Sequence, residues 1–303
     1  MSTKKELLVQ QTNEIMTQYT TKLTLRQIFY RLVSTHTVKN TVQEYKYLSS
    51  VLVKARMSGE VPFDSMEDRT RSIKGGDSVS EYDSPNDLVD SWESAFRTCY
   101  KFWEVPHWKD QENHVEIWLE KEALSGLFGQ TTDQHKVRLA TCRGYPSLTF
   151  MYEACKHLKQ IDLPKTILYF GDFDPSGMDI ERHIQERLYE FGVDAKVIRI
   201  GITREQIDQY NIPPMPTKKT DARSASFMET HGDIAVELDA LDPDVLQQLI
   251  KDSILEYFDE EIYNEVIEAR DKVREELREK LDTLNLDWGE TDEEDQTDEE
   301  SEE

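Results

Sequence analysis

Apolar residues in the first 71 positions recur at helical spacing in two segments separated by a short turn. The first stripe consists of Leu25, Ile28, Phe29, Leu32 and Val33. Thr24 is placed to cap this helix, and Thr41 with Glu44 forms a capping-box pattern that opens a second one. An irregular stretch over residues 60–71 then stands where a wing would follow. This order is the outline of a winged helix-turn-helix, so we predict a DNA-binding domain over residues 1–71.

The next segment, residues 72–113, changes from a polar stretch to a helix. Residues 72–87 contain Gly75-Gly76 and Pro85, which are typical of a linker or an exposed loop. Helical spacing resumes from Leu88 to Trp103 and then stops. We therefore expect a linker and a single helix between two domains.

From residue 114 onward, short apolar runs alternate with amphipathic segments. The runs predict strands at residues 115–119, 137–142, 166–170 and 196–200, with a later strand at 234–238. The segments between them predict helices at residues 121–129, 147–159 and 177–191. Strands and helices that alternate at this spacing form a parallel sheet covered by helices. We predict an α/β, Rossmann-like domain over residues 114–259.

The C-terminal region reads as helical and then structureless. Asp242 followed by Pro243 is a helix start that runs to about Phe258, and residues 260–286 form a long charged helix. Residues 287–303 hold almost no apolar side chain, so we expect a disordered acidic tail.

Charge is distributed unevenly along the chain. The net charge is −25, but residues 287–303 contain eleven acids and no Lys or Arg. Residues 20–57 contain seven Lys or Arg against one acid, which makes this segment basic and favours DNA as a partner. The alternative is a solvated helical face on an acidic, solubilising surface.

Cysteines and apolar runs bear on the compartment. The three cysteines have no metal-ligand spacing, and the scattered histidines argue against zinc. No apolar run is long enough to span a bilayer, and the N-terminus lacks a signal-peptide core. We expect a reduced, cytoplasmic protein with no membrane association.

Three carboxylates follow two of the predicted strands. Glu120 comes after the first strand, and Asp172 and Asp174 come after the third. In open parallel sheets, ligands collect beyond the carboxyl ends of the strands. Clustered anions repel, and Mg²⁺ resolves the conflict through oxygen ligands while it keeps positions for water and phosphate. The alternative is that these acids favour helix N-termini, as single acids often do.

Three short motifs resemble the Toprim domain of the topoisomerase VI A subunit, whose family includes the meiotic double-strand-break protein. They are Trp118-Leu119-Glu120-Lys121, Gly144-Tyr145-Pro146-Ser147 and Gly171-Asp172-Phe173-Asp174-Pro175. Residues 26–30, Arg-Gln-Ile-Phe-Tyr, are similar to the family's tyrosine motif on its winged-helix domain. Gln27 departs from it, because the family has Asp after the arginine.

The resemblance implies a DNA-cleaving enzyme. Tyr30 would attack the phosphodiester and form a 5′-phosphotyrosyl link, while Glu120, Asp172 and Asp174 hold Mg²⁺. Tyrosine and metal would come from different subunits of a homodimer acting on double-stranded DNA. No Gly-x-x-x-x-Gly-Lys occurs, so complete topoisomerase activity would need a separate ATPase subunit.

The helix itself bears on the role of the tyrosine. At roughly 100° per residue, Tyr30 lies off the apolar stripe, so its hydroxyl is expected to reach solvent or substrate. Arg26, one turn earlier, could bind phosphate and stabilise a phenolate. The alternative is a half-buried tyrosine that packs at the helix edge.

Five basic residues are candidate contacts to DNA. They are Lys121, Arg143, Lys218, Lys219 and Arg223. Lys121 and Arg143 could equally serve the local structure, and the other three could belong to an ordinary exposed loop. Glu237 and Asp239 follow a late strand, where they could support the metal site or cap structure.

Three functions remain open from the sequence. The leading one is a dimeric, Mg²⁺-dependent, topoisomerase VI A-like enzyme that cuts DNA through Tyr30. The second is a Toprim nuclease that hydrolyses DNA with metal-activated water. The third is a DNA-binding protein without catalysis.

Overall fold

The computed structural model describes residues 3–19, 22–67, 82, 84–217, 221 and 223–284. The chain divides into two compact units, each described by itself. The first comprises residues Met1–Gly76 and His107–Tyr263, and the second comprises Asp77–Pro106 and Asn264–Glu303. The linker from residue 72 to 81 and the acidic tail fall outside the described residues.

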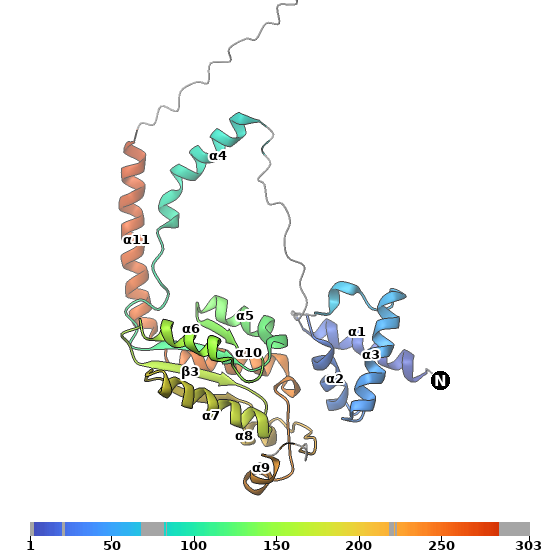
Figure 1. Ribbon diagram of the computed structural model, residues 1–303. Helices are drawn as coiled ribbons and strands as arrows, with labels where there is room; N and C mark the ends of the chain where they lie inside the picture. The colour runs from blue at the N-terminus through green and yellow to red at the C-terminus, as the bar shows by residue number, and fades with distance from the viewer. Residues whose placement is uncertain are drawn as a thin grey trace, which may run out of the picture. The chain divides into compact units, whose positions relative to one another are not determined.

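A four-stranded parallel sheet forms the centre of the first unit (Figure 1). Its strands are β1 (His114–Leu119), β2 (Arg138–Thr141), β3 (Lys165–Phe170) and β4 (Lys196–Gly201). Their order is β2-β1-β3-β4, so the two strands that precede the predicted acids are neighbours, with Leu119 in register with Phe170. The α/β class with a parallel sheet is therefore confirmed.

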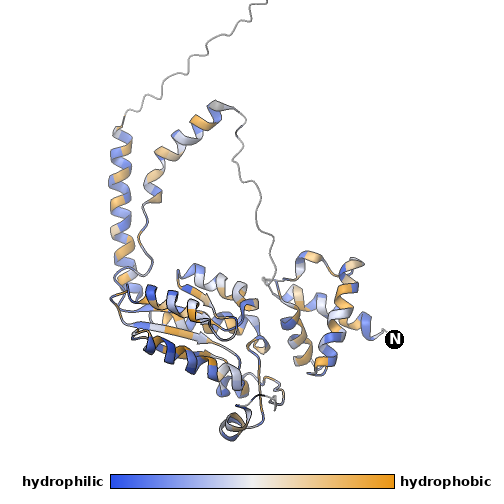
Figure 2. Ribbon diagram, in the orientation of Figure 1, coloured by the Kyte–Doolittle hydropathy of each residue, from blue (hydrophilic) through white to orange (hydrophobic). Residues whose placement is uncertain are grey.

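Alternate residues of the strands feed two cores on opposite faces of the sheet. Trp118 and Tyr169 pack with α6 (Leu148–Leu158) and α7 (Pro175–Glu190). Residues one position away, such as Ile117 and Leu168, pack with α5 (Ser125–Gln134) and α10 (Pro243–Leu255). Because both faces are covered, the central strands β1 and β3 are buried over most of their length, and hydrophobic residues are prominent in the sheet (Figure 2).

Several helix boundaries differ from the sequence prediction for local reasons. The segment after β1 forms the 3-10 turn η3 (Glu122–Leu124) before α5 begins. The helix α7 starts two residues early, because Asp174 caps it and Pro175 takes the first helical position. Asp242 caps α10 as expected. The remaining short helices are α8 (Arg204–Gln209), α9 (Ser224–His231) and the 3-10 turn η4 (Leu238–Ala240).

The predicted strand at residues 234–238 is wrong. Ala235 and Val236 form only isolated bridges, to Met215 and to Phe173. Phe173 lies in the loop beyond the end of β3, so the segment pairs with loops outside the sheet. This pairing carries Glu237 and Asp239 toward the carboxyl edge of the sheet.

In the first unit, three described helices precede the sheet: α1 (Lys4–Gln18), α2 (Leu25–Ser34) and α3 (Val42–Met57). Thr24 caps α2 in a reciprocal capping box with Gln27, which gives the departure from the family motif a structural role. Thr41 accepts from the backbone N–H of Glu44, whose carboxylate binds Lys4 instead of closing the box. After the 3-10 turn η1 (Phe63–Ser65), the described residues form one bridge, Leu23 to Met66, and no wing hairpin.

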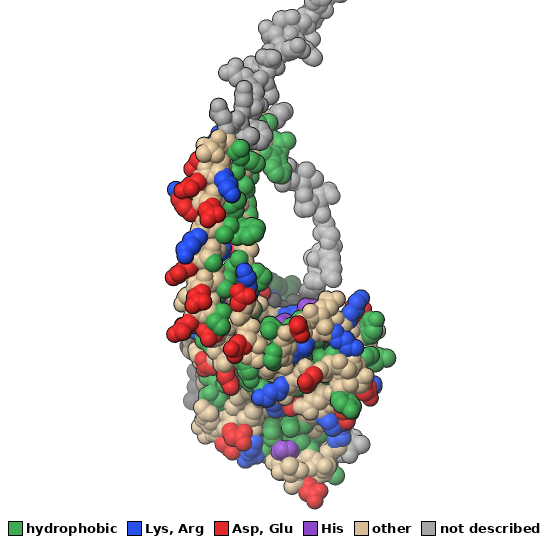
Figure 3. All heavy atoms as spheres, turned by 90° about the vertical axis from the view of Figure 1, so that its left-hand side faces the viewer, with side chains coloured by type: hydrophobic (Ala, Val, Ile, Leu, Met, Phe, Trp, Pro, Cys, Tyr) green, Lys and Arg blue, Asp and Glu red, His purple; other side chains and the backbone are tan. Residues whose placement is uncertain are grey.

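The second unit consists of α4 (Pro85–Arg97), the 3-10 turn η2 (Cys99–Phe102) and most of α11 (Glu260–Thr283). Acidic and basic side chains intermingle along α11, with apolar side chains beside them (Figure 3). Arg274 donates to the carbonyls of Lys101 and Trp103 and holds the two segments together. None of the helices in the described ranges combines the length and apolarity that crossing a bilayer requires.

Candidate metal and nucleic-acid site

The structure brings the predicted carboxylates to one edge of the sheet. Glu120 directly follows β1, and Asp172 and Asp174 follow β3 after Gly171. Because β1 and β3 are parallel neighbours, both loops leave the sheet at its carboxyl edge. Glu120 and Asp174 are half-buried, and Asp172 is buried.

Each of the three carboxylates is anchored through one oxygen by a backbone N–H. Glu120 Oε2 accepts from the N–H of Asp172 at 2.9 Å. Asp172 Oδ1 accepts from Leu238, and Asp174 Oδ1 accepts from Gly177, both at 2.8 Å. Within the described part of the chain, no hydrogen bond is made to the second oxygen of any of them. The three side chains are therefore oriented and still have an oxygen free for a ligand.

Two glycines allow this loop to approach Glu120 closely. A Cβ atom on Gly171 would lie 2.7 Å from Glu120 Oε2, and a Cβ on Gly177 would clash with the carbonyl oxygen of Asp172. A side chain at Gly171 would displace the Glu120 carboxylate, and one at Gly177 would displace the backbone of Asp172. This close approach explains why glycine stands at both ends of the Gly-Asp-Phe-Asp-Pro-Ser-Gly motif.

Arg199 on β4 supports the same loop and was missed by the sequence prediction. Its guanidinium donates to the carbonyls of Gly171 and Asp172 at 3.2 Å and to that of Gly177 at 2.9 Å. Glu181 on α7 pairs with it at 2.7 Å. An arginine inside the otherwise apolar run Lys-Val-Ile-Arg-Ile-Gly was the available signal, since a buried cation needs partners.

Lys121 occupies the centre of the acidic edge rather than facing solvent. Its Nζ lies 2.7 Å from Asp239, 3.0 Å from Asp172 and 3.1 Å from Glu237. The sequence suggested a phosphate contact or a helix start for this lysine. The structure instead shows an ammonium that neutralises three carboxylates, two of them from the segment after residue 234.

The electrostatics of this edge favour additional positive charge. Burial raises the pKa of Asp172 to about 7 and also raises that of Glu120. Burial opposes the charge on Lys121, but Asp239, Asp172 and Glu237 raise its pKa well above the ordinary value. One ammonium therefore does not compensate the whole set of acids.

Mg²⁺ fits the donor set of this edge. Carboxylate oxygens are its preferred ligands, and it commonly takes one or two of them and completes its shell with water or phosphate. Asp239 Oδ1 is a buried oxygen without a hydrogen-bond partner in the described part of the chain, which is a further deficit of positive charge. Glu120, Asp172 and Asp174 do not form a tight cage, because their carboxylate oxygens do not all lie within 4.8 Å of one another. Among the described residues, only His114, Glu116 and His157 meet that distance.

Arg26 and Tyr30 of α2 lie beside the carboxylates of the same chain. Arg26 pairs with Glu237, which also binds Lys121. Tyr30 is within electrostatic range of Glu237, Lys121 and Arg26. Most of the Tyr30 side chain is buried, since the residue is 4% exposed, and it lines a pocket with Arg26 and Glu237. The turn η4 packs against α2 and covers a side of the helix that its own sequence cannot reveal.

A cleft of about 890 Å³ opens onto the acidic edge. Glu120 and Lys121 line one side of it, and α2 and α3 line the other. Charged residues of both signs line it, the cations Arg26, Arg56, Lys121 and Arg143 and the acids Glu67, Glu120, Glu122 and Asp239. Arg143 pairs with Glu122, but its side chain remains 70% exposed, as expected for a residue that can contact phosphate.

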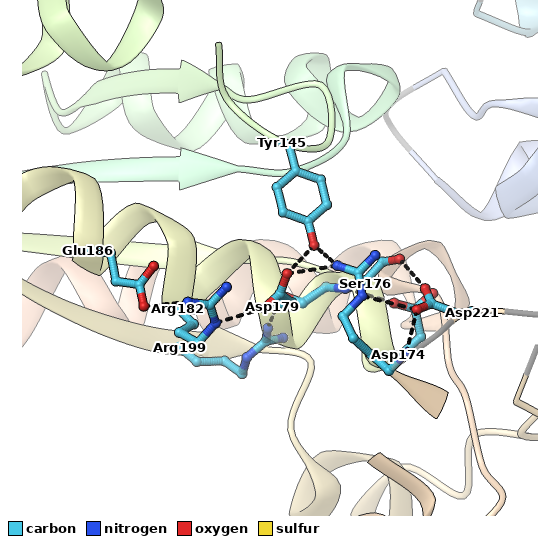
Figure 4. Close-up of polar contacts among 10 residues, drawn as sticks. Tyr145, Asp174, Ser176, Asp179, Arg182, Glu186, Arg199 and Asp221 are labelled. Atoms are coloured by element: carbon cyan, nitrogen blue, oxygen red, sulfur yellow. Dashed lines mark hydrogen bonds and ion pairs between the residues drawn. The ribbon is translucent and has the colours of Figure 1, made fainter. Parts of the chain in front are cut away.

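The other basic candidates differ in what the structure shows. Arg223 pairs with Asp179 and Asp221 and donates to the hydroxyl of Tyr145, so two carboxylates already neutralise it. Figure 4 shows Tyr145 pointing from the loop after β2 toward Asp179 on α7. Lys218 and Lys219 lie outside the described residues.

No protein-family model matches the sequence, and no curated protein matches it either. The likeness to the topoisomerase VI A family therefore rests on the three Toprim-like motifs and the tyrosine motif. Two of these motifs carry Glu120, Asp172 and Asp174, which lie together at the carboxyl edge of the sheet.

Proposed function

We propose that the protein is a magnesium-dependent enzyme that cleaves the phosphodiester backbone of double-stranded DNA. The observation that carries the proposal is the set of three carboxylates, each fixed through one oxygen and free at the other, at the carboxyl edge of adjacent parallel strands. Bound Mg²⁺ would polarise the phosphate and stabilise the leaving oxygen. The same carboxylates would fix where the phosphate lies.

The proposed DNA-binding site is the cleft between the acidic edge and the helices α2 and α3. Arg26, Arg56 and Arg143 line it and carry charge that suits a phosphate backbone. The helices α2 and α3 would act as the helix-turn-helix of a winged-helix domain. Two chains related by a two-fold axis would place one site on each strand of the duplex.

Water is the attacking group that this arrangement favours. Burial raises the pKa of Tyr30, and Glu237 shifts it in the same direction, so the phenol is neutral and a poor nucleophile. A covalent route through Tyr30 is the second candidate, because Tyr30, Arg26 and Glu237 line one pocket of about 270 Å³ beside the carboxylates. That route would require removal of the phenol's proton, which the raised pKa of Tyr30 opposes.

The test is cleavage of supercoiled plasmid by the full chain as Mg²⁺ is titrated. Glu120→Gln keeps the acceptor for the Asp172 N–H, and Asp174→Asn keeps a good helix cap, so both should fold. We expect each to lower the cleavage rate by at least about 100-fold, because each removes charge at the proposed metal.

Glu153→Gln is the matched control, because Glu153 is an exposed acid on α6 away from this edge. It should leave the rate unchanged, and chelation of Mg²⁺ should stop cleavage. If the protein shifts plasmid on a gel without nicking or linearising it, the chain binds DNA without cutting it and the proposal fails.

A further inference from the structure

A second cluster of metal-ligating side chains lies at the opposite edge of the sheet from the carboxylates. His114 and Glu116 belong to β1, and His157 belongs to the last turn of α6. One ligand atom from each lies within 4.8 Å of the other two. The start of β1 and Glu120 are separated by the length of a six-residue strand, roughly 20 Å at about 3.3 Å per residue.

The positions of the three side chains follow from the fold. His114 and Glu116 are two residues apart on a strand, so both point to the face that α6 covers. His157 reaches them from α6, near the packing of Leu158 in the core on that face. The cluster therefore ties the end of a helix to the start of the central strand.

The distances match those between ligands of a tetrahedral zinc ion. His114 Nε2 lies 3.3 Å from Glu116 Oε1, and His157 Nε2 lies 3.5 Å from the same oxygen. Ligands held at about 2.05 Å in a tetrahedron are separated by about 3.3 Å. Glu116 Oε1 thus already stands at this spacing from each imidazole nitrogen, and all three ligand atoms lie within 4.8 Å of one another.

Glu116 is held in the orientation that a ligand needs. It is 2% exposed, and its Oε2 accepts a hydrogen bond from Trp118 Nε1 at 2.9 Å. That bond leaves Oε1 directed at the two histidines. A donor behind a metal-binding carboxylate commonly fixes its orientation in this way.

Arg138 is the cation that a metal would have to replace. Its Nη1 lies 3.6 Å from Glu116 Oε1, and its side chain is 51% exposed. Because the guanidinium lies at the surface, it can move into solvent when a metal takes its place at the carboxylate. The exposed side of His157 provides the route of entry.

We propose that His114, Glu116 and His157 form a binding site for a zinc-class divalent ion, with water as the fourth ligand. Two imidazoles and one carboxylate are a donor set that suits zinc better than magnesium. The ion would brace α6 against β1, on the edge of the sheet remote from DNA cleavage. The site does not depend on the function proposed above.

The test is titration of the metal-free full chain with Zn²⁺, with the heat of binding measured by calorimetry. A parallel titration uses Co²⁺, whose visible absorption reports tetrahedral coordination. We expect one zinc per chain at this site and a rise in the melting temperature. His157→Ala should weaken zinc binding by more than about 100-fold and abolish the rise. The His157 side chain is partly exposed, at 39%, so the variant should remain folded.

Two controls separate this site from other metal-binding groups. His36→Asn removes an exposed histidine from a turn where asparagine tolerates the positive φ, and it should bind zinc as the wild type does. Asp174→Asn should also keep zinc binding, whatever its effect on DNA cleavage. If the wild type binds no zinc, or if His157→Ala binds it with unchanged affinity, the three side chains form only ion pairs and the proposal is overturned.

Discussion

Asp174 serves the fold with one carboxylate oxygen and leaves the other for a ligand. Its Oδ1 caps α7 through the N–H of Gly177. Glu120 divides its oxygens in the same way, because its Oε2 holds the Asp172 N–H. A change to alanine at either position would remove structure and charge together. The amide variants matter for this reason, since they keep the acceptor and remove only the charge.

The Tyr30→Phe variant tests whether the phenolic oxygen of Tyr30 takes part in cleavage. Tyr30→Phe removes the phenolic oxygen and keeps the ring that packs edge-on against Phe29. We expect the variant to cleave plasmid within about threefold of the wild-type rate, because water attacks in the hydrolytic route. Denaturing gels should show no DNA covalently attached to the wild-type protein.

The opposite outcome would identify the covalent route. A denaturant-stable adduct that the wild type forms and Tyr30→Phe loses would make Tyr30 the nucleophile. Glu120→Gln would then lose the adduct too, because both routes use the metal. Asp174→Asn provides a second check on the same point.

At the residue scale, the sequence predicted which acids gather but not what surrounds them. Glu120, Asp172 and Asp174 follow apolar runs, so their common edge could be read from strand order in a parallel sheet. The Lys121 ammonium points into the acidic edge because it pairs with Glu237 and Asp239, which follow it by more than a hundred positions in the sequence. The burial of Tyr30 depends on contacts of the same long range, such as those between α2 and η4, which the spacing within one helix cannot reveal.

At the scale of elements, Asp242 connects α10 to the N-terminal helices. Its side chain accepts from the N–H of Asp244, as a cap. It also accepts from Arg31 on α2 at 2.6 Å and from the hydroxyl of Tyr19 at 2.8 Å. One carboxylate therefore starts a helix and fixes the position of α2 beside the turn η4.

Asp242→Ala should lower the free energy of unfolding by about 2–4 kcal/mol, because it removes a cap and leaves a mostly buried arginine without its carboxylate. Asp242→Asn should lose less, since asparagine still caps the helix. Asp244→Ala changes an exposed acid two residues along and should cost under about 0.5 kcal/mol. Urea unfolding measures all three. Equal losses for the alanine and asparagine variants would show that only the charge matters.

Elements were predictable where the local signal is strong. The four strands were placed within a residue or two, because each contains a short apolar run. The two central strands, β1 and β3, are buried over most of their length. The Asp-Pro pair located the start of α10 for the same local reason. Residues 234–238 carry a strand-like pattern, yet their partners are Met215 and Phe173 in loops. Pattern alone does not distinguish a sheet strand from a bridged extended segment.

For the whole molecule, the sign of the charge changes from one end of the chain to the other. Residues 20–57 carry seven Lys or Arg against one acid, and Arg26 and Arg56 from this segment line the cleft. Residues 287–303 carry eleven acids. A tail of that charge is a competitor for the same cations that would bind a phosphate backbone. We therefore expect the tail to weaken DNA binding by electrostatic competition.

Deleting residues 287–303 should tighten DNA binding by about threefold to tenfold at low salt, because the competing charge is lost. The gain should shrink as ionic strength rises, since screening shortens the reach of the tail. The matched control keeps the tail and replaces its Asp and Glu by Asn and Gln, and it should bind DNA as tightly as the deletion. Fluorescence anisotropy of a labelled duplex measures the affinities. If the deletion tightens binding but the neutral tail does not, bulk rather than charge is responsible, and an unchanged affinity for both removes the tail from DNA binding altogether.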